Sequence, residues 1–380
     1  MIKKITIIIS SIIIFIITFL IYLNYYGVET AKFNSLIKNE IKSYNNDLNI
    51  DLKKVKLLLD LKKFSIKIKT INPTIIYKKN KIEIKKISTI FSLESYFKKN
   101  FGINNVLIST KETNINELIN ISKSIKKSPE IYIISQIIKK GKVEANIDLK
   151  FDENGKIKSD YKVKGSAKGI ELNIPKNQKI NDITFDFSII DNYINFKNIY
   201  FNYNKIKFYS ESVLFKNEED VYFIEGKLKN NEALLDSNIL SSIFSNDINY
   251  LKFNNAKFIS NTTFNLKISK KYKIKDYNLK SKININEIKY NLKSEIINKY
   301  LKNYKDNIDL QNNILNIELS KKNLLISGTS NYSINEIKNK FNYKINKAKD
   351  IYDFKTNIIL DNIELDINEL NYKKLKNTKA

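Results

Sequence analysis

The chain has 380 residues and a formal net charge of +26, from 66 Lys and Arg residues against 40 Asp and Glu residues. It contains no His and no Cys, which removes the commonest general base, thiol nucleophiles and soft metal sites. Lysines are scattered along the chain without a nucleic-acid recognition motif, and we expect no enzyme activity, cofactor, metal or nucleic-acid partner.

The chain opens with an uncharged apolar run, Ile5–Leu23, which follows Lys3 and Lys4. At about 1.5 Å per residue, a helix of this length spans roughly 28 Å, close to the hydrocarbon thickness of a bilayer. We therefore predict a cytoplasmic stub and one transmembrane helix at 1–27, with an uncleaved export signal as the alternative. The apolar positions assigned to the span include Ile5, Ile9, Ile13, Phe15, Phe19 and Leu23.

The charges beside this run predict its orientation. Because Lys3 and Lys4 precede the run and the next charge is Glu29, the N-terminus should stay in the cytoplasm. The expected localisation is a bacterial inner membrane, crossed once, with the body of the protein in the periplasm. Without Cys, that body must be stable without disulfides.

Residues 28–128 are predicted to form an αβ segment. Apolar residues at helical spacing predict a short amphipathic helix just after the span: Phe33, Leu36, Ile37, Ile41 and Tyr44. Packing on the following sheet is its favoured role, and lying on the membrane surface is the alternative. Further strands and one helix are expected at Phe64–Lys69, Ile82–Ile84, Phe101–Ile108 and Leu118–Ile121, and the segment ends near Ser128 and Pro129.

Residues 129–380 are predicted to form an antiparallel meander. Apolar and polar residues alternate over Val143–Phe151, Asn154-Gly155 is a strong hairpin signal, and the return strand carries Tyr161 and Val163. Later strands are expected at Ile183–Ile189, Ile194 to Phe196, Phe201 to Tyr203, Ile206 to Phe208, Phe264–Ile268, Ile283 to Ile285, Leu315–Leu319, Phe341–Ile345 and Ile363–Ile367. Helices are expected at Leu234–Phe244 and Ile297–Tyr304.

The expected fold is therefore mainly β: one transmembrane helix, then a long curled antiparallel sheet with a few short helices. Such a sheet covers its apolar face by folding into a sandwich or barrel, or it forms a trough whose interior holds acyl chains. Periodicity is compatible with both. The residues predicted to line that groove are Phe64, Ile66, Ile68, Ile82, Ile84, Val143, Ile147, Leu149, Phe151, Phe185, Phe187, Phe196, Phe208, Phe264, Leu266 and Ile268.

Acidic residues gather at Glu218–Asp220 and at Asp361, Glu364 and Asp366. Acidic residues in turns between strands are usually solvated, so we interpret these segments as turns and not as catalytic sites. The excess of Lys accompanies an abundance of Ile, Asn and Tyr, the set that an AT-rich genome encodes. The charge is therefore interpreted as largely compositional, with a weak attraction to anionic lipid headgroups.

Several short sequence segments resemble those of AsmA-like proteins. They are Leu59-Asp60-Leu61, Asn72-Pro73-Thr74 and Ile87–Phe97, together with Gly141–Ile189, which is similar to the central region of the YhdP branch. The resemblance implies a chorein-like N-terminal segment and a bridge-like carrier of phospholipid between inner and outer membranes. The implied partners are phospholipid acyl chains and the inner membrane.

The chain is far shorter than YhdP-type and TamB-type relatives. About fifteen to twenty strands, spaced about 4.8 Å apart, give a trough of roughly 70–90 Å. An outer-membrane or periplasmic partner, a fragment of a longer bridge and a smaller AsmA-like role are the alternatives for this length. The alternative function is a non-conducting, membrane-anchored scaffold or assembly factor for outer-membrane biogenesis.

Overall fold

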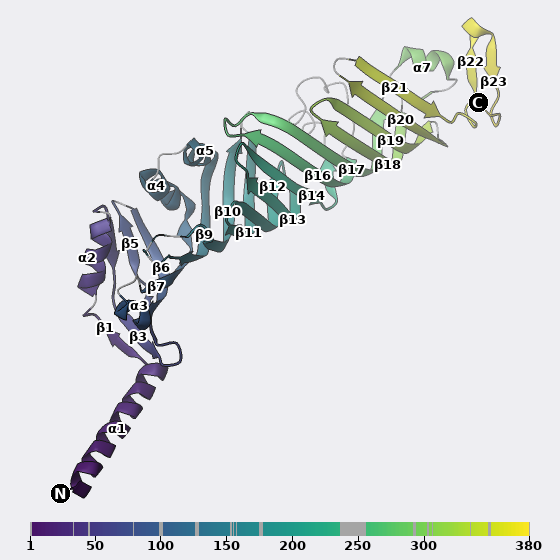
Figure 1. The fold of residues 1–380 in the computed structure, drawn as a ribbon. Coiled ribbons are helices and arrows are strands. Elements are labelled where there is room, and N and C mark those ends of the chain that lie inside the picture. The colour runs from purple at the N-terminus through teal and green to yellow at the C-terminus, as the bar shows by residue number, and fades with distance from the viewer. Residues whose placement is uncertain are drawn as a thin grey trace. The chain divides into compact units, whose positions relative to one another are not determined.

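The computed structural model describes residues 2–32, 34–44, 46–78, 80–98, 102–125, 129–152, 154, 156, 158–174, 178–235, 256–291, 294–301, 304–305, 307–334, 336–348 and 351–379. The chain is mainly β, with 65% strand, and 21 of the described strands belong to one antiparallel sheet (Figure 1). This confirms the expected mainly β, antiparallel fold with few helices. The chain divides into two compact units, Met1–Asn195 and Phe196–Ala380.

The N-terminal apolar run forms helix α1, Ile2–Tyr25. The side chains of Ile2–Thr6 and of Ile8 lie outside the described part of the structure. Among the residues that the structure describes, no helix is both long and apolar enough to cross a membrane. After α1 the chain turns at Gly27, whose φ of +67° favours glycine and where a Cβ would lie 2.3 Å from the carbonyl oxygen of Leu57. This close approach packs the end of α1 against the first long strand of the sheet.

Unit 1 is built on antiparallel strands, most of which pair in chain order. Their bounds are β1 Val28–Thr30, β2 Leu48–Asp51, β3 Val55–Asp60, β4 Ser65–Ile71, β5 Thr74–Tyr77, β6 Asn80–Ser92, β7 Ile103–Thr110, β8 Thr113–Asn114, β9 Ile138–Lys150, β10 Lys162–Ile174 and β11 Gln178–Ile190. The ladder runs β1, β3, β4, β6, β7, β9, β10, β11. The short strands β2 and β5 extend one end of β6, and β8 pairs with β9.

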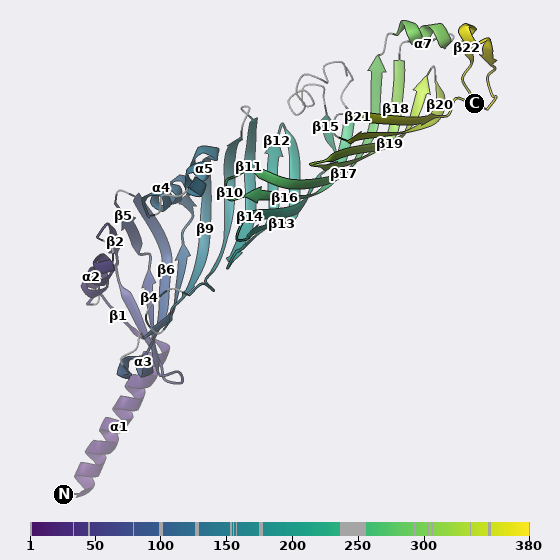
Figure 2. The ribbon, with the colours of Figure 1, turned by 45° about the horizontal axis from the view of Figure 1, so that its top comes forward.

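Helices are added to this sheet at two places. Helix α2, Asn34–Tyr44, contacts β2, which agrees with the expected packing of the amphipathic helix on the following sheet. Helix α4, Ile115–Ile125, contacts β6 and β9, and α5, Pro129–Ile137, contacts β9 and β10. In Figure 2, α4 and α5 lie together at one end of these strands. The sequence predicted α4 but not α5, because the apolar residues of α5 run directly into β9.

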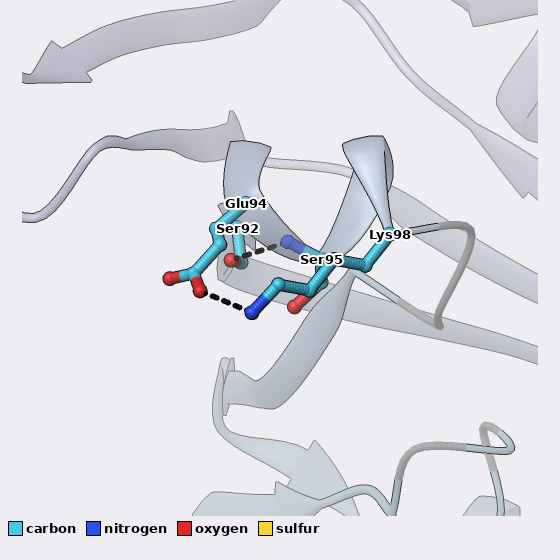
Figure 3. Close-up of polar contacts among 4 residues, drawn as sticks. All are labelled: Ser92, Glu94, Ser95 and Lys98. Carbon is cyan, nitrogen blue, oxygen red and sulfur yellow. Dashed lines mark hydrogen bonds and ion pairs between the residues drawn. The ribbon is translucent and has the colours of Figure 1, made fainter.

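The expected strand beginning at Phe64 starts one residue later. Phe64 lies in the turn before β4, with a φ of 44°, and its ring stacks on Phe97 of helix α3, Leu93–Phe97, at 6.5 Å between centroids. Helix α3 is short and is stabilised at its start by Ser92, whose Oγ accepts a hydrogen bond from the Ser95 N–H at 3.1 Å (Figure 3). The phenyl group of Phe64 therefore belongs to this corner and not to a strand face.

The hairpin predicted at Asn154-Gly155 joins β9 to β10, although Gly155 itself lies outside the described residues. Its loop is longer than the two-residue signal indicates, because β10 begins only at Lys162 and Tyr161 still belongs to the loop. The Asp152 carboxylate accepts hydrogen bonds from the backbone N–H groups of Asn154 and Lys156, at 2.9 and 2.8 Å. This Asp side chain organises the loop in place of a tight turn.

Unit 2 is a further antiparallel ladder in the order β13, β14, β16, β17, β18, β19, β20, β21. The strand bounds are β12 Tyr193–Tyr203, β13 Ile206–Asn217, β14 Val221–Asn230, β15 Ala233–Leu235, β16 Ala256–Ser269, β17 Ile274–Asn291, β18 Asn307–Ser320, β19 Asn323–Ile334, β20 Ile337–Ala348, β21 Ile351–Ile358, β22 Leu365–Ile367 and β23 Tyr372–Lys374. The two strands expected around Ile194 and Tyr203 are a single strand, β12.

The helices and the last strand predicted in unit 2 have mixed outcomes. Helix α7, Glu295–Tyr300, forms where a helix was expected, and its Ser294 cap accepts a hydrogen bond from the Ile297 N–H. Leu234, expected to begin a helix, lies in β15, and the rest of that prediction falls outside the described residues. The strand expected from Ile363 begins at Leu365, and it pairs with β23 in a separate two-stranded sheet.

Candidate functional site: the apolar faces of the sheet

Cross-strand register places a continuous row of apolar side chains on one face of unit 1. Residues opposite one another in an antiparallel pair project to the same face, so each pairing extends that face by one strand. Ile68 lies opposite Leu57 and Thr89, and Ile147 lies opposite Ile108 and Val163. The apolar face of unit 1 consists of Leu57, Leu59, Ile66, Ile68, Ile87, Phe91, Val106, Ile108, Val143, Ile147, Leu149, Val163, Phe185, Phe187 and Ile189.

The side chains named here are half-buried, which leaves part of each accessible, whereas Ala167, opposite Val143 and Phe185 on the same face, is only 1% exposed. Their neighbours along the strands point to the opposite face, where Lys67, Glu144 and Asp186 are exposed. The structure therefore brings together seven of the predicted groove residues on one face: Ile66, Ile68, Val143, Ile147, Leu149, Phe185 and Phe187.

Other predicted groove residues of unit 1 lie in different surroundings. Ile82 and Ile84 lie near the start of β6, a strand that α4 contacts, and Ile84 is only 2% exposed. A register shift next to Ile84 separates this packed end from the more open stretch. Phe151 follows β9, with its backbone N–H bonded to the Asn104 carbonyl oxygen at 3.0 Å. Phe64 is removed from the face by its place in the turn.

Unit 2 repeats the arrangement of unit 1. Leu266 lies opposite Ile224 and Tyr277, and Ile317 lies opposite Ser281 and Ile326. The apolar face of unit 2 includes the half-buried residues Phe208, Val213, Phe215, Ile224, Phe264, Leu266, Ile268, Leu279, Ile283, Ile285, Leu315, Ile317, Leu319, Ile326, Phe341, Tyr343 and Ile345. Phe258, opposite Ile285 on the same face, is buried, at 8% exposed. Phe196, in β12, is half-buried, and its place on this face stays a prediction.

The strands of the unit 2 ladder, from β13 to β21, are joined edge to edge in one sheet (Figure 1). The α-helix described in this unit, α7, contacts β22, and β22 pairs with β23 in a separate two-stranded sheet. A sandwich or barrel and an open trough both stay predictions for how the apolar face is covered.

Polar residues on the apolar face of unit 2 bond to one another. The Asn230 Oδ1 atom accepts hydrogen bonds from the Ser260 N–H at 2.8 Å and from the Ser260 hydroxyl at 2.5 Å. The hydroxyls of Thr262 and Ser281 lie 2.8 Å apart. A buried polar group is costly unless it is hydrogen-bonded, so these pairs allow polar residues to sit among Ile, Leu and Phe.

Glycines on the apolar faces lie beneath aromatic rings of the neighbouring strand. A Cβ built on Gly328 would meet three atoms of the Tyr343 side chain, at 2.4 to 2.5 Å. A Cβ at Gly165 would lie 2.6 Å from the Phe187 ring, and one at Gly226 would lie 2.9 Å from the Phe264 ring. The rings cover the strand backbone because glycine has no side chain to hold them away.

The opposite face is polar and carries cross-strand ion pairs. Lys280 lies opposite Glu318 with 3.3 Å between charged atoms, and the Glu211 carboxylate accepts a hydrogen bond from Lys229 at 2.6 Å, which lowers the Glu211 pKa. A cavity of about 320 Å³ is lined by residues of both faces, among them Thr329 and Asn342 on the polar face and Ser330 and Phe341 on the apolar face.

Clusters of acidic residues do not form a metal site among the residues that the structure describes, and the groups around Glu218 and Asp361 include no such arrangement there. A comparison with protein-family models, with curated proteins and with solved structures returned no match. The resemblance to AsmA-like proteins therefore stays a prediction.

The sequence did not single out much of the apolar face. The list of predicted groove residues omitted Leu57, Leu59 and Ile108, and it stopped at Ile268, before β17 to β20. Apolar and polar residues alternate in β17, β18 and β20, but Leu57–Leu59 and Val106–Ile108 are continuous apolar runs. In such runs only the pairing with neighbouring strands shows which side chains lie on the shared face.

Proposed function

We propose that this protein is a membrane-anchored, AsmA-like carrier that holds phospholipid acyl chains along the apolar faces of its β-sheet, between inner and outer membrane. The observation that carries the proposal is the continuity of those faces: half-buried Ile, Leu, Val and Phe side chains follow one another across consecutive strands in each unit. Water-exposed apolar surface of this extent is a typical feature of binding surfaces.

Acyl chains fit these faces by their chemistry. Each methylene group transferred from water to apolar surroundings contributes about 0.8 kcal/mol, and the rows of branched and aromatic side chains offer such surroundings over many strands. Some of the polar groups among them bond to each other, as Asn230 and Ser260 do. Pairs of this kind favour hydrocarbon over a polar solute at those positions.

Anchoring in the inner membrane is the second part of the proposal. It is supported by the sequence run Ile5–Leu23 and by the exposed apolar side chains described on α1, such as Phe15, which is 70% exposed. With Lys3 and Lys4 on the cytoplasmic side, the sheet would lie in the periplasm. A non-conducting scaffold is the competing function, and packing of the kind seen at Ile84 favours it.

Site-specific photo-crosslinking in cells separates the two functions. A crosslinker at Ile147, Phe187 or Phe264 should capture phospholipid, because these side chains lie on the apolar faces. The matched controls are the next residues along the same strands, Asp148, Ser188 and Asn265, which project to the other face and should capture none. Equal capture at both sets of positions, or none at either, would contradict lipid carriage.

A charge on the apolar face gives an independent test. In an accessible face, Phe187→Asp should leave a folded protein that no longer crosslinks lipid from position 147, since a carboxylate repels hydrocarbon and can still be hydrated. In a dry core the same change would unfold the domain, because an unpaired buried charge is costly. Circular dichroism distinguishes these outcomes, and unfolding would favour the scaffold.

The proposed topology is tested at the N-terminus. Ile13→Arg should cost about 2.5–3.5 kcal/mol of insertion free energy and shift the protein from the membrane fraction to the soluble fraction. A periplasm-dependent alkaline phosphatase joined after Ala380 should be active, and a cytosol-dependent fluorescent reporter at the same place should be dark. A bright cytosolic reporter would reverse the orientation.

A further inference from the structure

Strand β21 is an exposed edge of the unit 2 ladder. All eight of its residues are exposed, including Ile351 at 74%, Tyr352 at 63% and Phe354 at 61%. Among the described residues it pairs with β20 alone. Exposed edge strands that carry large apolar side chains are templates for pairing with another strand, and natural proteins usually protect them with charges, proline or a bulge.

The hydrogen-bond phase of β21 shows which backbone groups are directed outward. Ile359 donates its N–H to the Lys340 carbonyl oxygen at 3.0 Å, so residues 359, 357, 355 and 353 direct their backbone groups toward β20. The N–H and C=O groups of Tyr352, Phe354 and Thr356 consequently point to the open edge. A strand added there would bond to these three residues.

We propose that the strand added to this edge is β21 of a second copy of the chain, antiparallel and centred on Phe354. In that register the two Phe354 residues lie opposite each other, and each Asp353 lies opposite Lys355 of the second copy. Within one chain these two side chains already project to the same face, with 3.7 Å between Lys355 Nζ and an Asp353 carboxylate oxygen. The pairing therefore forms two opposite-charge cross-strand pairs by symmetry.

Neighbouring registers lack this complementarity. Moving the two-fold axis to Asp353 places two carboxylates opposite each other, and moving it to Lys355 places two ammonium groups opposite each other, which is destabilising. The centred register also agrees with the hydrogen-bond phase, because Phe354 has its backbone groups directed outward. Phe354 lies opposite Ile345 of the apolar face, so pairing of the two copies would join their apolar faces.

Cysteine trapping tests this register directly, because the chain has no Cys of its own. In the proposed pair the two Phe354 Cα atoms lie about 5.5 Å apart, within the roughly 4.4–6.8 Å that a disulfide spans. The full chain with Phe354→Cys, purified in detergent and mildly oxidised, should give a disulfide-linked dimer on a non-reducing gel. The matched control is Ile351→Cys, which is at least as exposed but lies about 20 Å from its copy along the strands.

Exchange of the charged residues provides a second test, in which every variant also carries Phe354→Cys. Asp353→Lys places Lys opposite Lys and should reduce the trapped fraction several-fold, and Lys355→Asp should do the same. The double variant Asp353→Lys with Lys355→Asp restores opposite charges and should restore trapping, while circular dichroism stays unchanged in all variants.

Equal trapping at positions 351 and 354, or failure of the double exchange to restore it, would overturn the proposal. If the Phe354→Cys variant forms no disulfide-linked dimer, the proposal is overturned as well. A strand of another protein would then be the candidate for pairing with this edge. None of these outcomes depends on lipid carriage, so the pairing and the proposed function can fail separately.

Discussion

Glycine at position 328 is the residue on which the Tyr343 ring lies. Gly328→Ala should destabilise the protein by about 1–3 kcal/mol, because the added methyl group forces the ring away from the strand. All three atoms nearest to the added Cβ belong to Tyr343. In a Tyr343→Leu background the same substitution should therefore cost much less, and urea unfolding of the four variants measures that coupling.

Gly165 provides the contrast to this pair. There the nearest atom to an added Cβ is the backbone carbonyl oxygen of Glu144, at 2.2 Å, and Phe187 comes second. Because a backbone atom cannot move aside as a side chain does, Phe187→Leu should not relieve Gly165→Ala. If removing the ring lowers the cost of Gly→Ala at both glycines, the rings alone limit the space at these positions. If it lowers the cost at neither, the backbone of the neighbouring strand limits that space.

Tyr332 is the residue whose protonation links unit 2 to pH. Its hydroxyl donates a hydrogen bond to the Ile359 carbonyl oxygen at 2.5 Å, and burial raises its pKa from 10.0 to about 12. The folded state therefore holds this proton more tightly than the unfolded state. The stability that comes from neutral Tyr332 is complete below about pH 10 and is lost as the pH rises toward about 12.

Comparison with Tyr332→Phe isolates this effect from the other tyrosines and lysines that titrate in the same range. The stability difference between the two proteins should be constant below about pH 10 and should shrink above it. A difference that stays constant up to about pH 12 would show that the raised pKa does not act on folding. Thermal unfolding recorded at intervals of pH provides the measurement.

Strand β6, which helix α4 contacts, carries the packed end of the unit 1 face. Ile84, near the start of β6, is 2% exposed, whereas Ile68 on β4 is half-buried. Ile84→Ala should cost about 2–5 kcal/mol of unfolding free energy, typical of a cavity in a core. Ile68→Ala removes the same atoms from a partly wet site and should cost clearly less. Denaturant unfolding of the two variants compares them, and equal costs would indicate that the whole face is packed.

At the scale of elements, alternation in the sequence was sufficient to predict most strands. It correctly located β9, β11, β16, β18 and β20, because one-sided burial leaves a period of two. It could not locate the start of β4, because Phe64 takes a left-handed conformation and stacks on Phe97, contacts that depend on helix α3. The edge strand β21 was not predicted, since both of its faces are exposed.

The sequence was sufficient to predict that the candidate site is an apolar face of the sheet, but it predicted only some of the residues on that face. Phe185 and Phe187 are two positions apart on one strand, which was sufficient to place both on the same face. The shift of register between Ile84 and Lys86 was not readable from the sequence, because a bulge depends on the partner strand. Cross-strand neighbours such as Val163 and Ile189 are distant in sequence, so only the folded sheet shows that they meet.

The whole molecule carries a formal net charge of +26, with Lys side chains on the polar faces of both units. We expect the purified protein to associate more strongly with vesicles that contain anionic lipid than with neutral ones. Exposed charges are screened within about 8 Å at physiological salt, so this association should weaken steeply as salt is raised. Co-sedimentation across a salt series measures it, and binding that is independent of both lipid charge and salt would contradict an electrostatic origin.

The mutual hydrogen bonds of polar residues on the apolar face of unit 2 have a consequence for selectivity. The Asn230 Oδ1 atom accepts hydrogen bonds from Ser260, and its Nδ2 group donates to the carbonyl oxygens of Asn231 and Phe258. The hydroxyls of Thr262 and Ser281 bond to each other. Such a surface distinguishes ligands by the hydrocarbon that they bury and is indifferent to the group that ends the chain. In a competition series, affinity should increase by about 0.8 kcal/mol per buried methylene and stay level when one headgroup replaces another of the same charge.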